Sequence, residues 1–153
     1  MKIDYKLQTE NEDIKYYNQK VAKLDTTYKL RISLPYWIDS SYVFSLFPLS
    51  PKKGDDIVMM IDNPYITGEG LEKVHHFKIN FHIHTTSKCK DDDKFDEITG
   101  LHICETKAEI KALEIIRKFM VNLKVNLELD EEPYYRMGIR LAKNHENLDR
   151  LSN

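Results

Sequence analysis

The stretch Val74–Thr86 constrains the fold most, because its side chains alternate between apolar and polar. The apolar set is Phe77, Ile79, Phe81 and Ile83, and the polar set is His76, Lys78, Asn80, His82 and His84. Successive side chains of a β-strand point to opposite faces of the sheet. The alternation therefore predicts a strand with one face on an apolar core and the other toward water, as in an antiparallel sheet with one open side.

Three other segments are predicted to be strands of the same sheet. The segment Thr27–Leu34 also alternates, whereas Asp55–Asp62 contains a short apolar run that is typical of a buried strand. A fourth strand is expected to end at Leu101–Cys104. It would pair with the strand at 74–86 through a charged turn at Lys88–Lys94, which makes an antiparallel hairpin.

Helices are predicted before and after these strands. Thr9 and Glu12 fit a capping box at the start of a helix over residues 9–24, in which apolar residues recur at helical spacing. Thr106 and Glu109 form a second capping box, which is followed by a long apolar stripe. We therefore predict an N-terminal helix and a long helix after the sheet.

The remaining segments complete a single domain. Trp37–Phe47 is predicted to be a short helix or loop, Asn63–Lys73 a loop, and a final helix is expected to begin near Pro133. The separation of strands from terminal helices favours an α+β fold, with an antiparallel sheet of about four strands and helices packed on one face. With 153 residues, the chain is expected to be one domain over residues 1–153.

Composition narrows the setting in which the protein works. The formal net charge is −2, which provides no overall attraction to nucleic acid or to acidic membranes. Cys89 and Cys104 are too few for a disulfide framework, and no apolar run has the length of a membrane span or signal peptide. We expect a cytoplasmic protein that does not enter membranes. Abundant Lys, Asn and Ile with only five Gly suggest an AT-rich genome, such as that of a phage or mobile element.

Three histidines form one candidate site. His82 and His84 lie on the same side of the strand at 74–86, and His102 would face them if the predicted hairpin forms. Imidazole groups in this arrangement suit a divalent metal such as zinc, or a phosphate group, and a phosphoesterase-type enzyme is one form of this alternative. The simpler interpretation is that these histidines line the wet face of a sheet and hold nothing.

A second candidate site is basic. Four polar side chains are expected to share the open sheet face, namely Lys29, Arg31, Lys78 and Asn80. They would contact the phosphates of a nucleic acid locally. The aromatic side chains of the strand at 74–86 point to the opposite face, where they cannot stack on bases, so nucleic-acid binding is not the favoured function.

Tyrosines provide the third candidate. At least one ring of the pair Tyr134 and Tyr135, on the final helix, must face outward, and tyrosine is enriched in protein interfaces. We find no nucleophile elbow, phosphate-binding Gly loop or helix-borne histidine pair with glutamate. We therefore expect a small non-enzymatic, regulatory binding protein without a cofactor, which acts through a protein partner or as a homodimer. Enzymatic activity at the histidines and local nucleic-acid binding are the alternatives.

Overall fold

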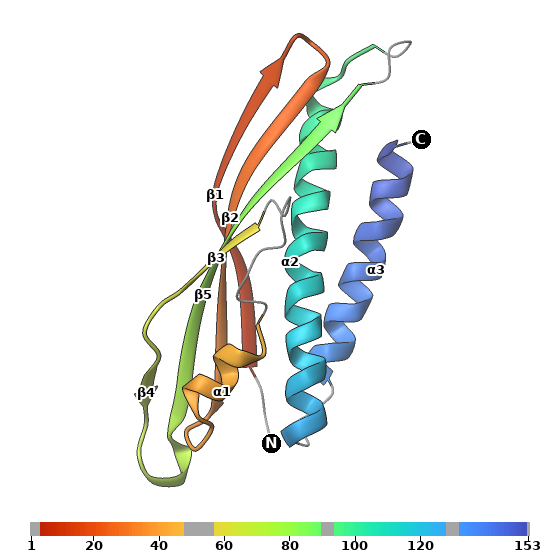
Figure 1. Cartoon of the computed structure of the whole chain (residues 1–153). Coiled ribbons are helices and arrows are strands. Elements are labelled where there is room, and N and C mark those ends of the chain that lie inside the picture. The colour runs from red at the N-terminus through yellow and green to blue at the C-terminus, as the bar shows by residue number, and fades with distance from the viewer. Residues whose placement is uncertain (1–3, 48–56, 90–93, 128–131, 153) are drawn as a thin grey trace.

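The fold is an antiparallel sheet with helices on one side (Figure 1). The computed structural model describes residues 4–47, 57–89, 94–127 and 132–152. The elements are β1 (Asp4–Tyr17), β2 (Val21–Pro35), α1 (Ser40–Ser45), β3 (Ile57–Ile61), β4 (Tyr65–Thr67), a 3₁₀ turn (Gly70–Glu72), β5 (Val74–Lys88), α2 (Glu97–Leu127) and α3 (Glu132–Ser152). The five-stranded sheet has the order β1-β2-β5-β3, and β4 also pairs with β5.

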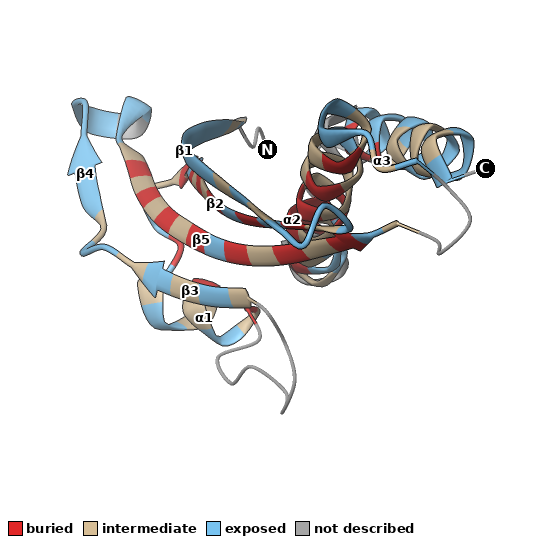
Figure 2. Cartoon of the chain, turned by 90° about the horizontal axis from the view of Figure 1, so that it is seen from above, coloured by how far each residue is buried: buried red, intermediate tan, exposed pale blue. Residues whose placement is uncertain are grey.

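The helices build two further layers on the sheet. Helix α2 packs against β2 and β5, and α3 packs against α2 (Figure 2). This arrangement confirms the predicted α+β class and the antiparallel sheet. Neither long helix has the apolar stretch that a membrane crossing requires, within the ranges that the structure describes.

The predicted N-terminal helix over residues 9–24 is wrong, because this segment forms the β1–β2 hairpin. The turn between the strands contains Asn18 and Gln19, with φ angles of 51° and 54°. Two positive φ angles are the signature of a tight hairpin turn, which usually carries Asn-Gly. Here Gln19 stands where glycine is usual, so the sequence lacks the Asn-Gly signature of this turn. Across the hairpin, Ile14 lies opposite Leu24, so residues with helical spacing in the sequence meet as a cross-strand pair.

The predicted fourth strand is also wrong, because Leu101–Cys104 lies inside α2. The helix begins earlier than the predicted start at Thr106, since the Asp96 carboxylate caps it. The Asp96 side chain accepts hydrogen bonds from the Ile98 backbone N–H (3.0 Å) and the Thr99 hydroxyl (2.8 Å). These hydrogen bonds hold the pKa of Asp96 below its usual range, and the bond from Thr99 has the largest effect. Such bonds satisfy N–H groups that have no partner within the helix.

The other predicted elements are present. The segments 27–34, 57–61 and 74–86 lie in β2, β3 and β5, the final helix is α3, and the segment Trp37–Phe47 contains α1. The predicted loop at Asn63–Lys73 also contains β4 and the 3₁₀ turn. Residues 55–56, and 90–93 of the predicted turn, lie outside the described ranges.

The main core lies between the sheet and α2. Burial alternates along β5, as the banding in Figure 2 shows. The largest fully buried side chains are Phe77, Phe81, Phe119, Leu24, Leu30, Ile32, Leu34, Ile79, Ile83, Leu113, Ile116 and Leu123. The ring of Phe47, beyond α1, stacks on that of Phe119, with centres 4.1 Å apart. A smaller cluster around Leu24 and Cys104 closes the hairpin end of the sheet.

Candidate binding site on the open sheet face

The face of the sheet opposite α2 is called here the open face. It carries the odd-numbered side chains of β2 and the even-numbered side chains of β5, whose neighbours in sequence are buried under α2. The sequence predicted the polar character of this face correctly. Its organisation depends on which residues the strand pairing brings into register.

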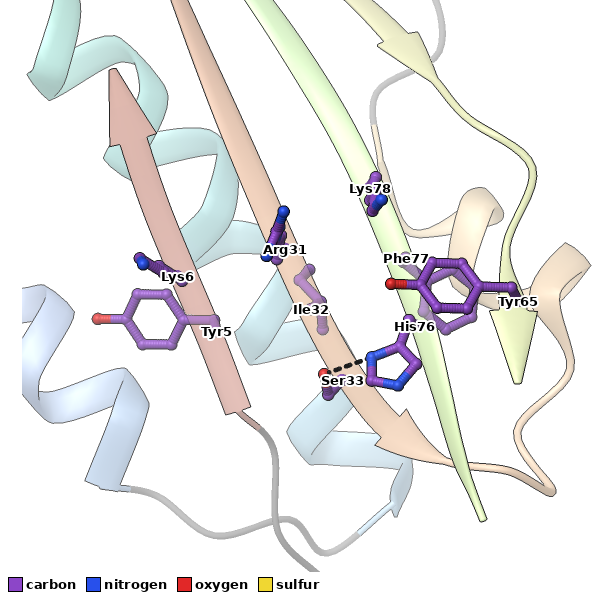
Figure 3. A pocket seen from close by; sticks show the side chains of 9 residues that line it. All are labelled: Tyr5, Lys6, Arg31, Ile32, Ser33, Tyr65, His76, Phe77 and Lys78. Atoms are coloured by element: carbon purple, nitrogen blue, oxygen red, sulfur yellow. Dashed lines mark hydrogen bonds between the residues drawn. The ribbon is translucent and has the colours of Figure 1, made fainter. Parts of the chain in front are cut away.

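Three cations lie side by side across the open face. Lys6 on β1 is paired with Arg31 on β2, and Arg31 is paired with Lys78 on β5. We call these residues the cation row. They line a shallow pocket together with Tyr5, Ile32, Ser33, Tyr65, His76 and Phe77 (Figure 3).

The cation row forms no ion pair within the described residues, although Asp62, which follows β3, lies beside Lys78. In the part of the chain that the structure describes, no carboxylate forms an ion pair with Lys6, Arg31 or Lys78. The Lys78 ammonium instead lies 5.2 Å from the centre of the Tyr65 ring, a cation–π contact. Like charges directly opposite each other weaken a sheet, so the row is electrostatically unfavourable in the free chain.

His76 borders the cation row and is held on both sides of its ring. Nδ1 lies 3.0 Å from the Ser33 hydroxyl, and Nε2 lies 2.7 Å from the Thr67 hydroxyl. The Tyr65 ring stacks on the imidazole, with centres 4.8 Å apart. The pocket therefore combines three cationic side chains with an aromatic wall held by hydrogen bonds and stacking, which suits the binding of an anionic group.

The three histidines of the predicted metal site are not brought together. His82 contacts the Thr27 hydroxyl (3.1 Å) and His84 contacts the Asp25 carboxylate (2.5 Å), both on the open face. His102 is on α2, on the other side of the sheet, and lies 3.6 Å from Glu105. Among the described residues, no group of three or more His, Cys, Asp or Glu side chains is placed to hold a metal ion. The geometry thus gives the metal alternative no support.

The predicted binding residues separate into different surroundings. Arg31 and Lys78 belong to the cation row, but the Lys29 ammonium is paired with the Glu10 carboxylate at 3.3 Å. Asn80 lies opposite Lys29, and its side-chain oxygen is buried without a hydrogen-bond partner in the described structure. Local nucleic-acid binding through these residues stays a prediction.

The two tyrosines predicted to bind a partner lie on α3. Tyr135 is exposed, whereas the side chain of Tyr134 lies outside the described part of the chain. The role of this pair in an interface stays a prediction.

Apolar side chains collect along the β3–β4 edge of the sheet. We call the exposed residues Val58, Met60, Tyr65 and Ile66 the edge strip. Val58 and Met60 are 54% and 53% exposed, and they point to the open face beside His82 and Asn80 of β5. Tyr65 shares the open face with them, whereas Ile66 lies opposite the buried His75 and faces the other way. Isolated exposed apolar residues are ordinary, but several along one edge are typical of contact surfaces.

The two edge strands differ in chemistry. The outer strand β1 carries many charged residues, namely Lys6, Glu10, Glu12, Asp13 and Lys15. Such charges discourage edge-to-edge association. The outer strand β3 has the sequence Ile-Val-Met-Met-Ile without a charge, and pairs only with β5 among the described strands. Strand β4 also carries no charged residue, so among the described strands the β3–β4 edge is the one suited to pairing with another polypeptide.

A separate acidic cluster lies between β1 and α2. Burial and repulsion from Glu105 raise the pKa of Glu12. The buried Tyr28 lines a pocket together with these glutamates. Burial, and to a smaller extent the charge of Glu109, raises the pKa of the Tyr28 hydroxyl. Arg140 on α3 pairs with Glu109 and so connects the two helices.

The raised pKa of Glu12 makes a pH-dependent contribution to stability. Because the folded chain holds this proton more tightly, the stabilisation is present below the ordinary glutamate pKa and lost as pH rises through the raised folded value. We expect Glu12→Gln to raise the melting temperature by about 1 °C at neutral pH, and the difference to disappear near pH ~4. Thermal unfolding followed by circular dichroism measures both. An equal shift at both pH values, or a shift for the exposed control Glu146→Gln, would contradict this assignment.

Of the residues that line the pocket, sequence reasoning assigned only Arg31 and Lys78 to a site, and it missed His76 among others. Lys6 precedes the segment predicted to be a helix, so the sequence did not indicate that Lys6 lies opposite Arg31. Ser33 and Tyr65 enter through strand pairing and through β4, a strand of three residues. The one signal present in the sequence was the polar alternation of β2 and β5, which placed Arg31 and Lys78 on one face.

Comparisons with protein-family models, with curated proteins and with solved structures find no significant match to this chain.

Proposed function

We propose that this chain is a non-enzymatic binding protein that holds an extended polypeptide segment of another protein along the β3–β4 edge of its sheet. The observation that carries the proposal is the coincidence of the uncharged β3 edge with the edge strip. The role is one of recognition: the groups that line this surface are apolar side chains, cations and hydroxyls.

Strand pairing supplies the first part of the binding. An extended segment placed beside β3 would bond to the backbone N–H and C=O groups that face away from β5, as in other cases where a peptide adds a strand to a sheet. Main-chain bonds of this kind are independent of the partner's sequence. They therefore need a second element that selects the partner.

The edge strip supplies that second element. Side chains of an added strand would alternate with the period of two that β3 follows, so every second residue would lie beside Val58 and Met60. Burial of apolar area contributes about 25 cal/mol per Å². We expect partners with apolar residues at alternate positions.

Introduction of negative charge into the edge strip tests the proposal. A fluorescein-labelled ten-residue peptide of alternating valine and serine is expected to bind the wild-type protein. The double variant Val58→Asp/Met60→Asp should weaken this binding about tenfold or more, because two carboxylates would be buried against apolar side chains. Fluorescence anisotropy gives the dissociation constants.

A matched control separates the site from general surface charge. Ile98→Asp/Ile139→Asp replaces two exposed apolar residues on the helices, which are 67% and 71% exposed, and should bind the peptide like the wild type. Equal loss in both double variants, or no binding by the wild type, would overturn the proposal. Native mass spectrometry adds a third outcome: a dimer that dissociates in the Val58→Asp/Met60→Asp variant would assign the edge to a second copy of the chain instead.

A further inference from the structure

We infer that the segment bound at the β3–β4 edge carries an acidic side chain, and that the cation row receives its carboxylate. This inference rests on the proposed function and names the chemistry of the partner. The cation row lies next to the edge strip, because Tyr65 belongs to both surroundings: it is part of the strip and its ring contacts Lys78.

The charge of the row is the first argument. Two residues along β2 on the same face, the Lys29 ammonium is paired with the Glu10 carboxylate. Arg31 and its neighbours Lys6 and Lys78 have no such partner in the described residues. An anionic ligand would remove the repulsion among the three cations on binding.

The geometry of the donors is the second argument. Neighbouring strands lie about 4.8 Å apart, so the row spans roughly 10 Å from β1 to β5. Arg31 stands at its centre, and a guanidinium group binds a carboxylate through two parallel hydrogen bonds. Lys6 and Lys78 flank it on the neighbouring strands (Figure 3).

The surroundings favour a carboxylate over a nucleic acid. Acidic residues stand beyond the row on the same face: Asp62 follows β3 beside Lys78, and Asp25 lies further along β2. A chain of phosphates running along the strands would meet these carboxylates on both sides. The apolar edge strip likewise suits a polypeptide. These surroundings suit an acidic side chain on an otherwise apolar segment.

Three labelled peptides test the inference. Each contains the alternating valine–serine core, flanked on both sides by two glutamates, two glutamines or two lysines. The wild-type protein is expected to bind the glutamate peptide about tenfold more tightly than the glutamine peptide. The variant Arg31→Gln/Lys78→Gln should abolish this preference while it keeps its affinity for the glutamine peptide.

The control variant removes the same charge elsewhere on the same face. Lys15 and Lys23 are also paired across β1 and β2, at the far end of the sheet, and Lys15→Gln/Lys23→Gln should keep the glutamate preference. Arg31→Gln/Lys78→Gln should melt no lower than the wild type, because it relieves repulsion.

The outcomes distinguish this inference from the proposed function. If no peptide binds, the proposed function fails. If all three peptides bind equally, only the acidic partner is excluded. The same holds if the two double variants of the protein lose the preference for the glutamate peptide equally. A twelve-nucleotide single-stranded DNA that binds more tightly than every peptide, and loses affinity steeply with salt, would replace the acidic segment by a nucleic acid.

Discussion

Replacement of Phe119 by alanine is expected to lower the free energy of unfolding by about 3–5 kcal/mol. The Phe119 side chain is fully buried on α2, and its ring stacks on that of Phe47. Truncation removes this contact and leaves a cavity where α2, the sheet and the segment after α1 meet. Urea denaturation followed by circular dichroism measures the loss.

Val121→Ala is the matched control for this prediction. Val121 lies on the same helix, two residues further along, and is 37% exposed, so its truncation should change stability by less than about 1 kcal/mol. If Phe119→Ala proves too unstable to purify, Phe119→Leu should show a smaller loss in the same direction. Equal effects at positions 119 and 121 would show that α2 presents a different face to the sheet.

Replacement of Leu24 by alanine is expected to cost about 2–5 kcal/mol and to loosen the hairpin end of the sheet first. Leu24 is fully buried in the smaller cluster beside Cys104. The Cys104 thiol donates to the Ala22 carbonyl at 3.5 Å, and burial raises its pKa. Both features protect the thiol from alkylation in the native state, so the rate of Cys104 labelling reports opening of this end.

The labelling experiment uses a Cys89→Ser background, so that Cys104 is the only thiol. Leu24→Ala should accelerate labelling strongly, whereas the neighbouring Lys23→Ala, on the open face, should leave it unchanged. Unchanged labelling in Leu24→Ala together with a lowered global stability would show that the two clusters unfold as one unit.

The two hydrophobic clusters explain how the fold can support binding at its edge. The main cluster holds β2 and β5 against α2, so these central strands keep the cation row in register without help from the edges. The outer strand β3 contributes only partly buried side chains to the same core. A partner segment at this edge would therefore extend the sheet without disturbing its centre.

Periodicity within a segment was enough to predict the central strands and the last helix. The alternation in Thr27–Leu34 and Val74–Thr86 is a property of each segment alone, because it records which side chains face the core. The same reasoning placed Arg31 and Lys78 on one polar face. The α+β class, the antiparallel sheet and the location of the core followed from these elements.

Tertiary pairing decided between helix and strand in the segments where local sequence patterns did not. Residues 9–24 have helical spacing and a capping box, yet they form a hairpin, because β2 finds its second partner in β5 and buries Leu24 there. Residues 97–104 belong to α2 because Asp96 caps the helix at its start. The strand predicted in this stretch would have had to pair with β5, but β2 and β3 already lie on the two sides of β5. Propensity is weak beside such long-range burial.

The polar face of Arg31 and Lys78 was predicted from the sequence, but the assembly of the candidate site was decided by tertiary pairing. The cation row joins Lys6 and Arg31 of the β1–β2 hairpin to Lys78 of β5, which is distant in the sequence, and strand register brings the three together. A shift of one residue would turn these side chains to the buried face. Register is set by the summed packing of the sheet on α2, a property of the whole chain that no single segment contains.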